Sequence, residues 1–208
     1  MEEKHYEGCT DEKQDLQGNR PNLVLDLDET LVYITRLKTL FPSEPIYAGK
    51  QKFYLHKRPG LSEFLERASA IYNIIIFTAA DKEYADSIIG KIAPFIPEGN
   101  RYYKKSIKNI KGFAVKDLNT LSLPIEKTIL VDDSPSSGIL QPLNQIIISP
   151  WHGEKEDNVI NAQLLPLVTN IGKSDNIPKA IVENTNKNRY ENLTIWPTLL
   201  KNKTSQTI

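Results

Sequence analysis

The segment NLVLDLDET, residues 22–30, decides the fold, because an apolar strand runs there directly into a cluster of acidic residues. A short, continuous apolar run of this kind is typical of a buried strand in a parallel sheet. Asp26 and Asp28 are two residues apart, so we expect their side chains to point the same way. Since ligands bind at the carboxyl ends of the strands in such sheets, the sequence predicts a functional site at these two aspartates.

The rest of the chain alternates between short apolar runs and helical patterns. The apolar runs predict three further strands, over residues 73–79, 128–133 and 145–149. Apolar residues at helical spacing predict helices over residues 63–72, 82–92 and 158–170, the first capped by Ser62 and the last interrupted by Pro166. This alternation predicts an α/β domain with a Rossmann-like central parallel sheet flanked by helices.

Residues 31–58 break this alternation. The segments LVYITRL (31–37) and KFYLHKR (52–58) predict a β-hairpin around a loop at 41–50 that contains proline and glycine. The hairpin is expected as a small insertion directly after the first strand.

The composition excludes several classes of protein. The 208 residues carry 26 basic and 26 acidic side chains, so the net charge of zero argues against binding nucleic acid through overall charge. The single cysteine, Cys9, allows no internal disulfide and no zinc site built on clustered cysteines. There is no signal peptide and no apolar run of membrane-spanning length. We therefore expect a soluble protein of the cytoplasm or nucleus of a eukaryotic cell, or one translocated into a host cell if the source is bacterial.

Polar side chains stand at the ends of the other strands as well. Asp132 and Asp133 close the strand at 128–133, Thr78 closes the one at 73–79, and Lys116 follows a short apolar run. Taken singly, these residues have ordinary explanations as turn acids, a cap and a surface lysine. Together they predict a site for a phosphoryl group and a divalent metal, because hard oxygen ligands suit Mg²⁺ and a cation relieves the repulsion among buried carboxylates.

With these residues in place, the sequence resembles the haloacid-dehalogenase (HAD) superfamily of aspartate-based phosphatases. Within that superfamily it is similar to the FCP/SCP-like (NIF-type) C-terminal-domain phosphatases. The similar segments, in the family's order, are LVLDLDETLV, HKRPGLSEFLERAS, IIIFTAADKEYAD, GFAVKDL and ILVDDSPSS. The resemblance implies a HAD-like fold without a large cap domain and makes residues 21–180 the phosphatase domain. Residues 1–20 are polar and show no periodicity, so we expect a flexible leader there, and residues 181–208 form a C-terminal extension.

The resemblance also implies the catalytic roles. Asp26 would be the nucleophile that forms an aspartyl-phosphate, and it would also bind Mg²⁺. Asp28 would act as general acid and then as general base, with its main-chain carbonyl on the metal. Thr78 and Lys116 would hold the phosphate oxygens, and Asp133 would be a further metal ligand.

Three further residues receive secondary roles from the resemblance. Thr30 and Asp132 would support the site by fixing the loop and by orienting water or Lys116. Lys104 stands where relatives carry an arginine that contacts the substrate, which makes it a candidate substrate contact.

The implied activity is a Mg²⁺-dependent protein phosphatase acting on phosphoserine, phosphothreonine or phosphotyrosine. Two alternatives stay open, a catalytically weak adaptor that binds phosphoproteins and a phosphatase of small molecules. We expect a phosphorylated protein as partner, no specific nucleic acid, and a monomer. The lysine-rich tail around Ile195, Trp196, Leu199 and Leu200 either contacts an anionic membrane or partner protein, or packs on its own domain.

Overall fold

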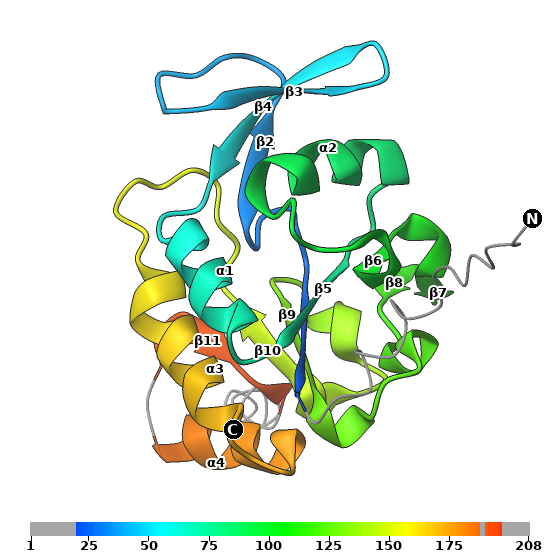
Figure 1. Ribbon diagram of the computed structural model, residues 1–208, viewed down its shortest axis with the longest axis vertical. Helices are drawn as coiled ribbons and strands as arrows, with labels where there is room; N and C mark the ends of the chain where they lie inside the picture. Colours follow the sequence, from blue (N-terminus) through cyan, green and yellow to red (C-terminus); the bar gives the residue numbers. More distant parts are fainter. Residues whose placement is uncertain (1–19, 188–189, 197–208) are drawn as a thin grey trace, which may run out of the picture.

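A six-stranded sheet forms the centre of the computed structural model, which describes residues 20–187 and 190–196 (Figure 1). The strand order is β11-β10-β9-β1-β5-β6, and every pair is parallel except β10 with β11. The strands are β1 (Asn22–Leu25), β5 (Asn73–Phe77), β6 (Arg101–Tyr102), β9 (Thr128–Asp132), β10 (Gln145–Ile148) and β11 (Leu193–Thr194). The predicted α/β fold with a central, mostly parallel sheet is confirmed.

The register of the central strands brings the predicted site residues to one edge of the sheet. Leu25, the last residue of β1, lies opposite Ile76 of β5 and Val131 of β9. The next residue along the chain, Asp26, donates its main-chain N–H to the carbonyl of Val131 at 3.1 Å. The carboxyl ends of β1, β5 and β9 therefore present their first polar side chains at the same level.

Apolar side chains of the sheet alternate between two cores. Leu23 and Leu25 belong to the larger core, together with the buried faces of four helices: α1 (Leu61–Ser69), α2 (Lys82–Ile92), α3 (Leu165–Ile171) and α4 (Ile177–Lys187). Val24 belongs to the smaller core with Leu118 and Leu121, which lie on a 3₁₀ turn. Because successive side chains of β1 point to opposite faces of the sheet, the strand packs against both cores.

The helix boundaries differ from the prediction at two places. Ser62 is not the cap of the first helix, because α1 begins at Leu61 and Gly60 occupies the capping position with φ of 81°. The helix expected over residues 158–170 is a π-helical turn, Ile160–Leu164, that leads into α3. Pro166 lies in the first turn of α3, directly after the π-helical turn.

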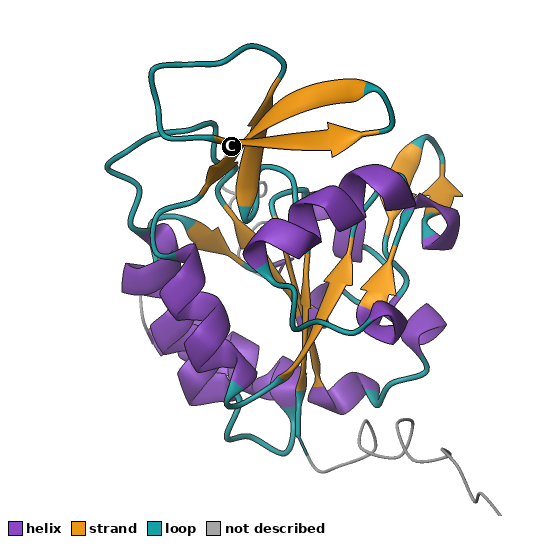
Figure 2. Cartoon of the chain, turned by 45° about the horizontal axis from the view of Figure 1, so that its top comes forward, coloured by secondary structure: helices purple, strands orange, loops and turns teal. Residues whose placement is uncertain are grey.

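The insertion after β1 is a three-stranded antiparallel sheet, where the sequence predicted a two-stranded hairpin. Its strands are β2 (Val32–Thr35), β3 (Glu44–Ala48) and β4 (Gln51–Lys57), in the order β2-β4-β3. The segment expected to be a loop, 41–50, contains β3, and the tight turn falls at Gly49, whose φ is 58°. The insertion projects from the end of the central sheet, away from α1, α3 and α4 (Figure 1 and Figure 2). A second small hairpin, β7 (Lys108–Ile110) and β8 (Phe113–Val115), leads to Lys116.

The described part of the expected C-terminal extension is packed into the same unit. The boundary at residue 181 falls inside α4, and β11 adds an antiparallel strand to β10. Ile195 is buried, and the indole N–H of Trp196 donates to the side chain of Gln145 at 2.9 Å. Leu199 and Leu200 lie outside the described residues. In the part of the chain that the structure describes, no helix has the length and apolarity needed to cross a membrane.

Two glycines give opposite tests of this packing. A Cβ at Gly60 would lie 2.6 Å from the side chain of Asn161, and its φ of 81° is unfavourable for other residues. Gly90, on the exposed side of α2, has no atom within 4 Å of that position. We expect Gly60→Ala to lower the free energy of unfolding by about 1–3 kcal/mol and Gly90→Ala to raise it by about 0.5–1 kcal/mol. Urea denaturation of both variants measures the difference, and equal effects would contradict it.

Candidate active site

Three carboxylates meet at the carboxyl ends of β1 and β9. Asp26, Asp132 and Asp133 each offer one oxygen atom, and these atoms all lie within 4.8 Å of one another. Asp132 is fully buried, whereas Asp26 and Asp133 are partly exposed. The cluster therefore has one closed side, toward the sheet, and one side open to a ligand.

Lys116 pairs with two of these carboxylates. Its ammonium group lies 2.7 Å from a carboxylate oxygen of Asp26 and also donates to Asp132. The side chain is buried, and the main-chain N–H is held by the carbonyl of Ser137 at 2.8 Å. Burial alone lowers the pKa of Lys116, but the charges of Asp132 and Asp26 outweigh this effect and raise the pKa. Lys116 is therefore a permanent cation at the centre of the site.

One buried lysine does not neutralise three carboxylates. Burial raises the pKa of Asp26 from its ordinary value of 3.8 to about 7, with the neighbouring Asp132 adding to the rise and Lys116 opposing it. Burial also raises the pKa of Asp133, against the hydrogen bond from Thr30. The chemistry of this donor set fits a divalent metal, since hard carboxylate oxygens with uncompensated negative charge are the ligands such ions prefer. Of the predicted metal ligands, Asp26 and Asp133 belong to this cluster and would hold the metal, and Asp132, which pairs with Lys116, could add a third oxygen.

Thr30 fixes the position of Asp133 through two hydrogen bonds. Its hydroxyl donates to the Asp133 carboxylate at 2.9 Å and accepts the Asp133 main-chain N–H at 3.1 Å. The preceding residue, Glu29, has φ of 59°, which turns the chain sharply after Asp28. The segment between β1 and β2 therefore holds Asp133 in place at the end of the neighbouring strand β9.

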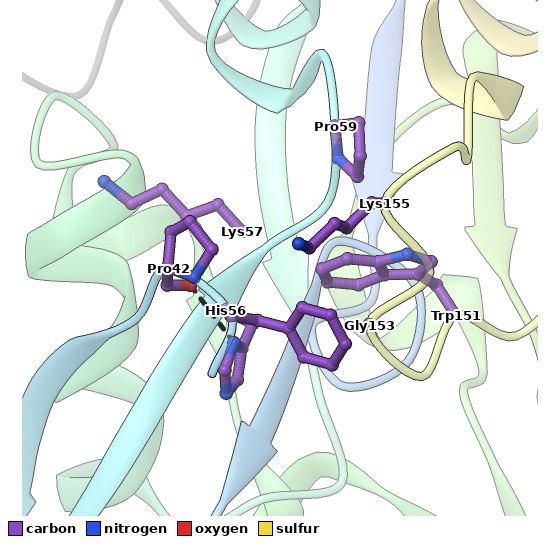
Figure 3. A pocket seen from close by; sticks show the side chains of 8 residues that line it. Pro42, His56, Lys57, Pro59, Trp151, Gly153 and Lys155 are labelled. Atoms are coloured by element: carbon purple, nitrogen blue, oxygen red, sulfur yellow. Dashed lines mark hydrogen bonds between the residues drawn. The ribbon is translucent and has the colours of Figure 1, made fainter. Parts of the chain in front are cut away.

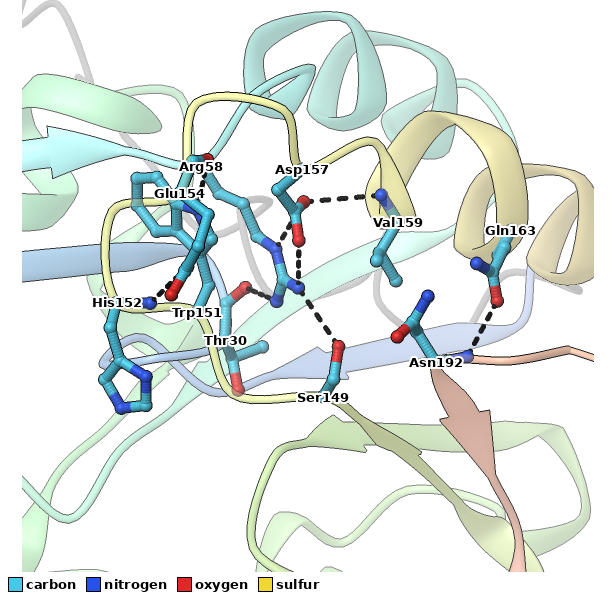
Figure 4. Close-up of polar contacts among 10 residues, drawn as sticks. All are labelled: Thr30, Arg58, Ser149, Trp151, His152, Glu154, Asp157, Val159, Gln163 and Asn192. Atoms are coloured by element: carbon cyan, nitrogen blue, oxygen red, sulfur yellow. Dashed lines mark hydrogen bonds and ion pairs between the residues drawn. The ribbon is translucent and has the colours of Figure 1, made fainter.

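Arg58 is hydrogen-bonded to this segment and is a residue that the sequence analysis did not single out (Figure 4). Its guanidinium group is fully buried and binds Asp157 through two hydrogen bonds of 3.0 and 2.8 Å. A third hydrogen bond, of 3.0 Å, goes to the main-chain carbonyl of Thr30. The Arg-Pro-Gly sequence before α1 was the available signal, but the partner Asp157 is 99 residues away and no spacing rule connects the two.

Asp28 lies beside the cluster with a different partner. One carboxylate oxygen accepts the hydroxyl hydrogen of Tyr84 at 2.6 Å. Burial raises the pKa of Asp28, although the hydrogen bond from Tyr84 opposes the rise. A carboxyl group with a raised pKa can carry a proton to a leaving group, which is the task expected of Asp28. Tyr84, from α2, is a second residue that the sequence analysis gave no role in the site.

Thr78 and Lys104, the remaining predicted site residues, differ in their exposure to solvent. Thr78 follows β5, is buried, and donates its main-chain N–H to Tyr102 at 2.9 Å. Its hydroxyl accepts the N–H of Ala80 at 3.1 Å, which fixes its orientation at the end of the strand. Lys104 is 63% exposed and pairs with Asp81 at 3.3 Å, so the structure places it outside the cluster.

Comparison with known proteins identifies the family. Residues 21–178 match the family described as NLI interacting factor-like phosphatase. The chain belongs to this family. The match covers the whole central sheet except β11, together with every residue of the site.

Named relatives agree with this assignment. The chain is 35% identical over 173 residues to a probable C-terminal domain small phosphatase of Dictyostelium discoideum, covering 79% of this chain and 55% of the relative. It is 31% identical over 160 residues to a human CTD small phosphatase-like protein, covering 74% of this chain and 57% of the relative. The chain thus spans little more than half the length of these relatives.

Solved structures show the same fold at low identity. The structure of Fcp1, an essential RNA polymerase II CTD phosphatase, is similar with a TM-score of 0.53 and 19% identity, over 80% of this chain and 50% of that one. A fission yeast Fcp1 variant bound to beryllium fluoride is similar with a TM-score of 0.50 and 21% identity, over 64% and 42% of the two chains. These likenesses confirm the HAD-like architecture.

Removing the support of Asp133 tests the assignment of the metal site. Thr30→Val keeps the volume of the side chain but removes both hydrogen bonds to Asp133, so we expect the affinity for Mg²⁺ to fall about 10–100-fold. Isothermal titration with Mg²⁺ measures the change, and Thr120→Val, on an exposed turn, serves as the control. An unchanged affinity in Thr30→Val would show that Asp133 needs no such support.

The raised pKa of Asp26 predicts the direction in which the stability of the folded protein changes with pH. The folded protein holds this proton more tightly than the unfolded chain, so the carboxylate destabilises the metal-free protein increasingly as pH rises from 3.8 toward 7. We expect Asp26→Asn in EDTA to be more stable than the wild type by about 1–3 kcal/mol at pH 8, and about equal to it at pH 4. Thermal unfolding at both pH values measures this. A less stable variant at pH 8 would mean that the ion pair with Lys116 outweighs burial.

Proposed function

We propose that this protein is a Mg²⁺-dependent protein phosphatase that works through an aspartyl-phosphate on Asp26. One observation carries the proposal: a chain of this phosphatase family retains a cluster of three carboxylates around a buried lysine at the carboxyl ends of parallel strands. A divalent metal bound at the cluster would neutralise the oxygens of the phosphoryl group. The nucleophile, the acid and the cation are all supplied by the chain itself.

In the first step, a carboxylate oxygen of Asp26 attacks the phosphorus atom of the phosphate ester. The new bond joins that oxygen to phosphorus, and the bond from phosphorus to the ester oxygen breaks. Asp28, whose pKa is raised by burial, gives its proton to the departing oxygen. Lys116 and Thr78 hold the phosphoryl oxygens, and the charge on Lys116 offsets the negative charge that they carry.

In the second step, a water molecule attacks the phosphorus atom of the aspartyl-phosphate. Asp28, now ionised, takes a proton from this water, and the bond between phosphorus and the Asp26 oxygen breaks. Inorganic phosphate leaves, and both aspartates return to their starting states. The hydrogen bond from Tyr84 keeps the carboxylate of Asp28 in one orientation for both proton transfers.

The substrate class follows from the shape of the site and from the relatives. The insertion is a small sheet and the described residues form no large cap over the site, so a phosphorylated side chain on a protein can reach it. Relatives are named as phosphatases of the C-terminal domain of RNA polymerase II, which is a protein substrate. We therefore favour phosphoserine, phosphothreonine or phosphotyrosine in a protein over a small metabolite. The named relatives are eukaryotic and lend no support to a bacterial effector.

Hydrolysis of phosphopeptides tests the proposal and separates the alternatives. With Mg²⁺ we expect turnover of p-nitrophenyl phosphate and of phosphoserine or phosphotyrosine peptides, faster than of sugar phosphates, and loss of turnover in EDTA. Asp26→Asn should lower kcat by about 10³-fold or more, because no other group replaces the nucleophile. Asp175→Asn, at a side chain that is 102% exposed, is the matched control and should retain activity.

Two outcomes would contradict the proposal. A folded wild type that binds phosphopeptides but turns over none of them with Mg²⁺ would be a phosphoprotein adaptor. Faster turnover of sugar phosphates than of any phosphopeptide would make the protein a small-molecule phosphatase.

A further inference from the structure

A pocket of about 320 Å³ opens between the insertion sheet and the loop that follows β10 (Figure 3). We call it the insertion pocket, and its lining residues are Phe41, Pro42, His56, Lys57, Pro59, Trp151, Gly153 and Lys155. Its volume lies in the range of pockets that bind ligands. The insertion pocket is separate from the cluster of carboxylates, and the mechanism described above does not use it.

Much of the wall of the insertion pocket is apolar, and hydrogen bonds hold parts of it in place. Trp151 is 3% exposed, and its indole N–H is held by the carbonyl of Glu154 at 2.9 Å. Pro42 is fixed from the other side, because its carbonyl contacts the buried ring of His56 at 3.1 Å. Phe41 is 42% exposed and completes the wall. An apolar side chain of a ligand would find preformed aromatic and proline surfaces there.

The charge of the insertion pocket is positive. The ammonium group of Lys155 lies 5.0 Å from the centre of the Phe41 ring, and within the described residues it makes no ion pair with a carboxylate. Lys57 turns its ammonium group away from the pocket, toward Glu44 at 2.8 Å. None of the described lining residues is acidic. Lys155 thus offers a cation beside an apolar wall, which suits a ligand that carries a carboxylate or phosphate next to an apolar group.

The same chemistry continues onto the loop between β2 and β3. Leu37 and Leu40 are 80% and 101% exposed, and Arg36 and Lys38 flank Leu37. Leu40 directly precedes Phe41 in the chain, so these two exposed leucines lie on the same loop as a wall of the insertion pocket. The loop therefore adds exposed apolar and basic side chains next to the insertion pocket.

The insertion pocket borders the active site through Tyr33, Glu29 and Trp151. Tyr33 lines a cleft together with Asp28 and Tyr84, and its ring packs against His56, 6.2 Å away between centres. On the other side, the main-chain N–H of Trp151 donates to the main-chain carbonyl of Glu29 at 2.8 Å. A peptide chain that crosses Tyr33 from Asp28 therefore arrives at the insertion pocket.

We propose that the insertion pocket and its adjoining loop bind an acidic, apolar segment of the phosphoprotein substrate that flanks the phosphorylated residue. An apolar side chain of this segment enters between Phe41 and Trp151, and a neighbouring carboxylate or second phosphate pairs with Lys155. A flat anionic membrane would contact the exposed leucines but would not fill a concave pocket. This inference rests on the proposed function and names the sequence context of its substrate.

Peptide kinetics test the inference directly. Two phosphoserine peptides differ only in a flanking block, Leu-Asp-Asp in one and Leu-Lys-Lys in the other, with the block placed on either side of the phosphoserine in separate pairs. We expect kcat/KM to favour the acidic peptide of one pair about tenfold in the full chain, mainly through KM. Lys155→Glu should remove this preference, and Lys173→Glu, a matched charge reversal at another exposed lysine, should keep it. Hydrolysis of p-nitrophenyl phosphate should be unchanged in both variants.

A second variant tests the apolar wall. Phe41→Ala should raise KM for the acidic peptide while leaving its turnover of p-nitrophenyl phosphate intact. The inference is overturned if the wild type does not distinguish the two peptides, or if Lys155→Glu behaves like Lys173→Glu. It is also overturned if Lys155→Glu lowers the hydrolysis of p-nitrophenyl phosphate equally, because the change would then act on the catalytic site.

Binding measurements keep this inference distinct from the proposed function. If the wild type hydrolyses neither p-nitrophenyl phosphate nor the peptides, the proposed function fails. Fluorescence anisotropy with the unphosphorylated acidic peptide then tests the pocket alone, with binding expected in the wild type and lost in Lys155→Glu. The last measurement is sedimentation of the protein with lipid vesicles that contain or lack phosphatidylserine. The surface would belong to a membrane if the protein sediments with the anionic vesicles, if this binding depends on Lys155, and if the enzyme shows no preference between the peptides. That combination would overturn the inference.

Discussion

The attraction between Lys116 and the carboxylates of Asp26 and Asp132 is the interaction on which the rest of the site depends. Three carboxylates at the mouth of a buried sheet repel one another and lose hydration, and burial accordingly raises the pKa of Asp26 to about 7. Lys116 reduces that cost without removing it. The remaining negative charge is what makes the site suited to a divalent metal and, through the metal and the lysine, to a phosphoryl group.

The strand register and a set of hydrogen bonds keep these charged side chains in place. The parallel register of β1, β5 and β9 brings Asp26, Thr78 and Asp132 to one edge of the sheet. Behind them, Thr30 is hydrogen-bonded to Asp133, and Arg58 ties the carbonyl of Thr30 to the buried ion pair with Asp157 (Figure 4). A buried arginine would be costly without such partners, and its hydrogen bond to the Thr30 carbonyl also orders the segment between β1 and β2.

The sequence predicted those parts of the molecule whose signals are local. Apolar runs predicted the four main strands, and the acids that follow β1 and β9 predicted the site. Strand β3 was missed because Glu44, Pro45 and exposed Tyr47 show no apolar alternation, and its place comes from pairing with β4. The support by Arg58 and Tyr84 was missed because their partners lie 99 and 56 residues away and become neighbours only in the folded chain.

Detection of phosphate on Asp26 tests the central claim most directly. An aryl phosphate has a good leaving group, so its first step needs little help from Asp28, whereas the attack of water still needs Asp28 as a base. Rapid mixing of Asp28→Asn with p-nitrophenyl phosphate and Mg²⁺ should therefore release one equivalent of nitrophenol in a burst, with the phosphoryl group found on Asp26 by mass spectrometry. No burst, or a phosphoryl group on another residue, would contradict the account.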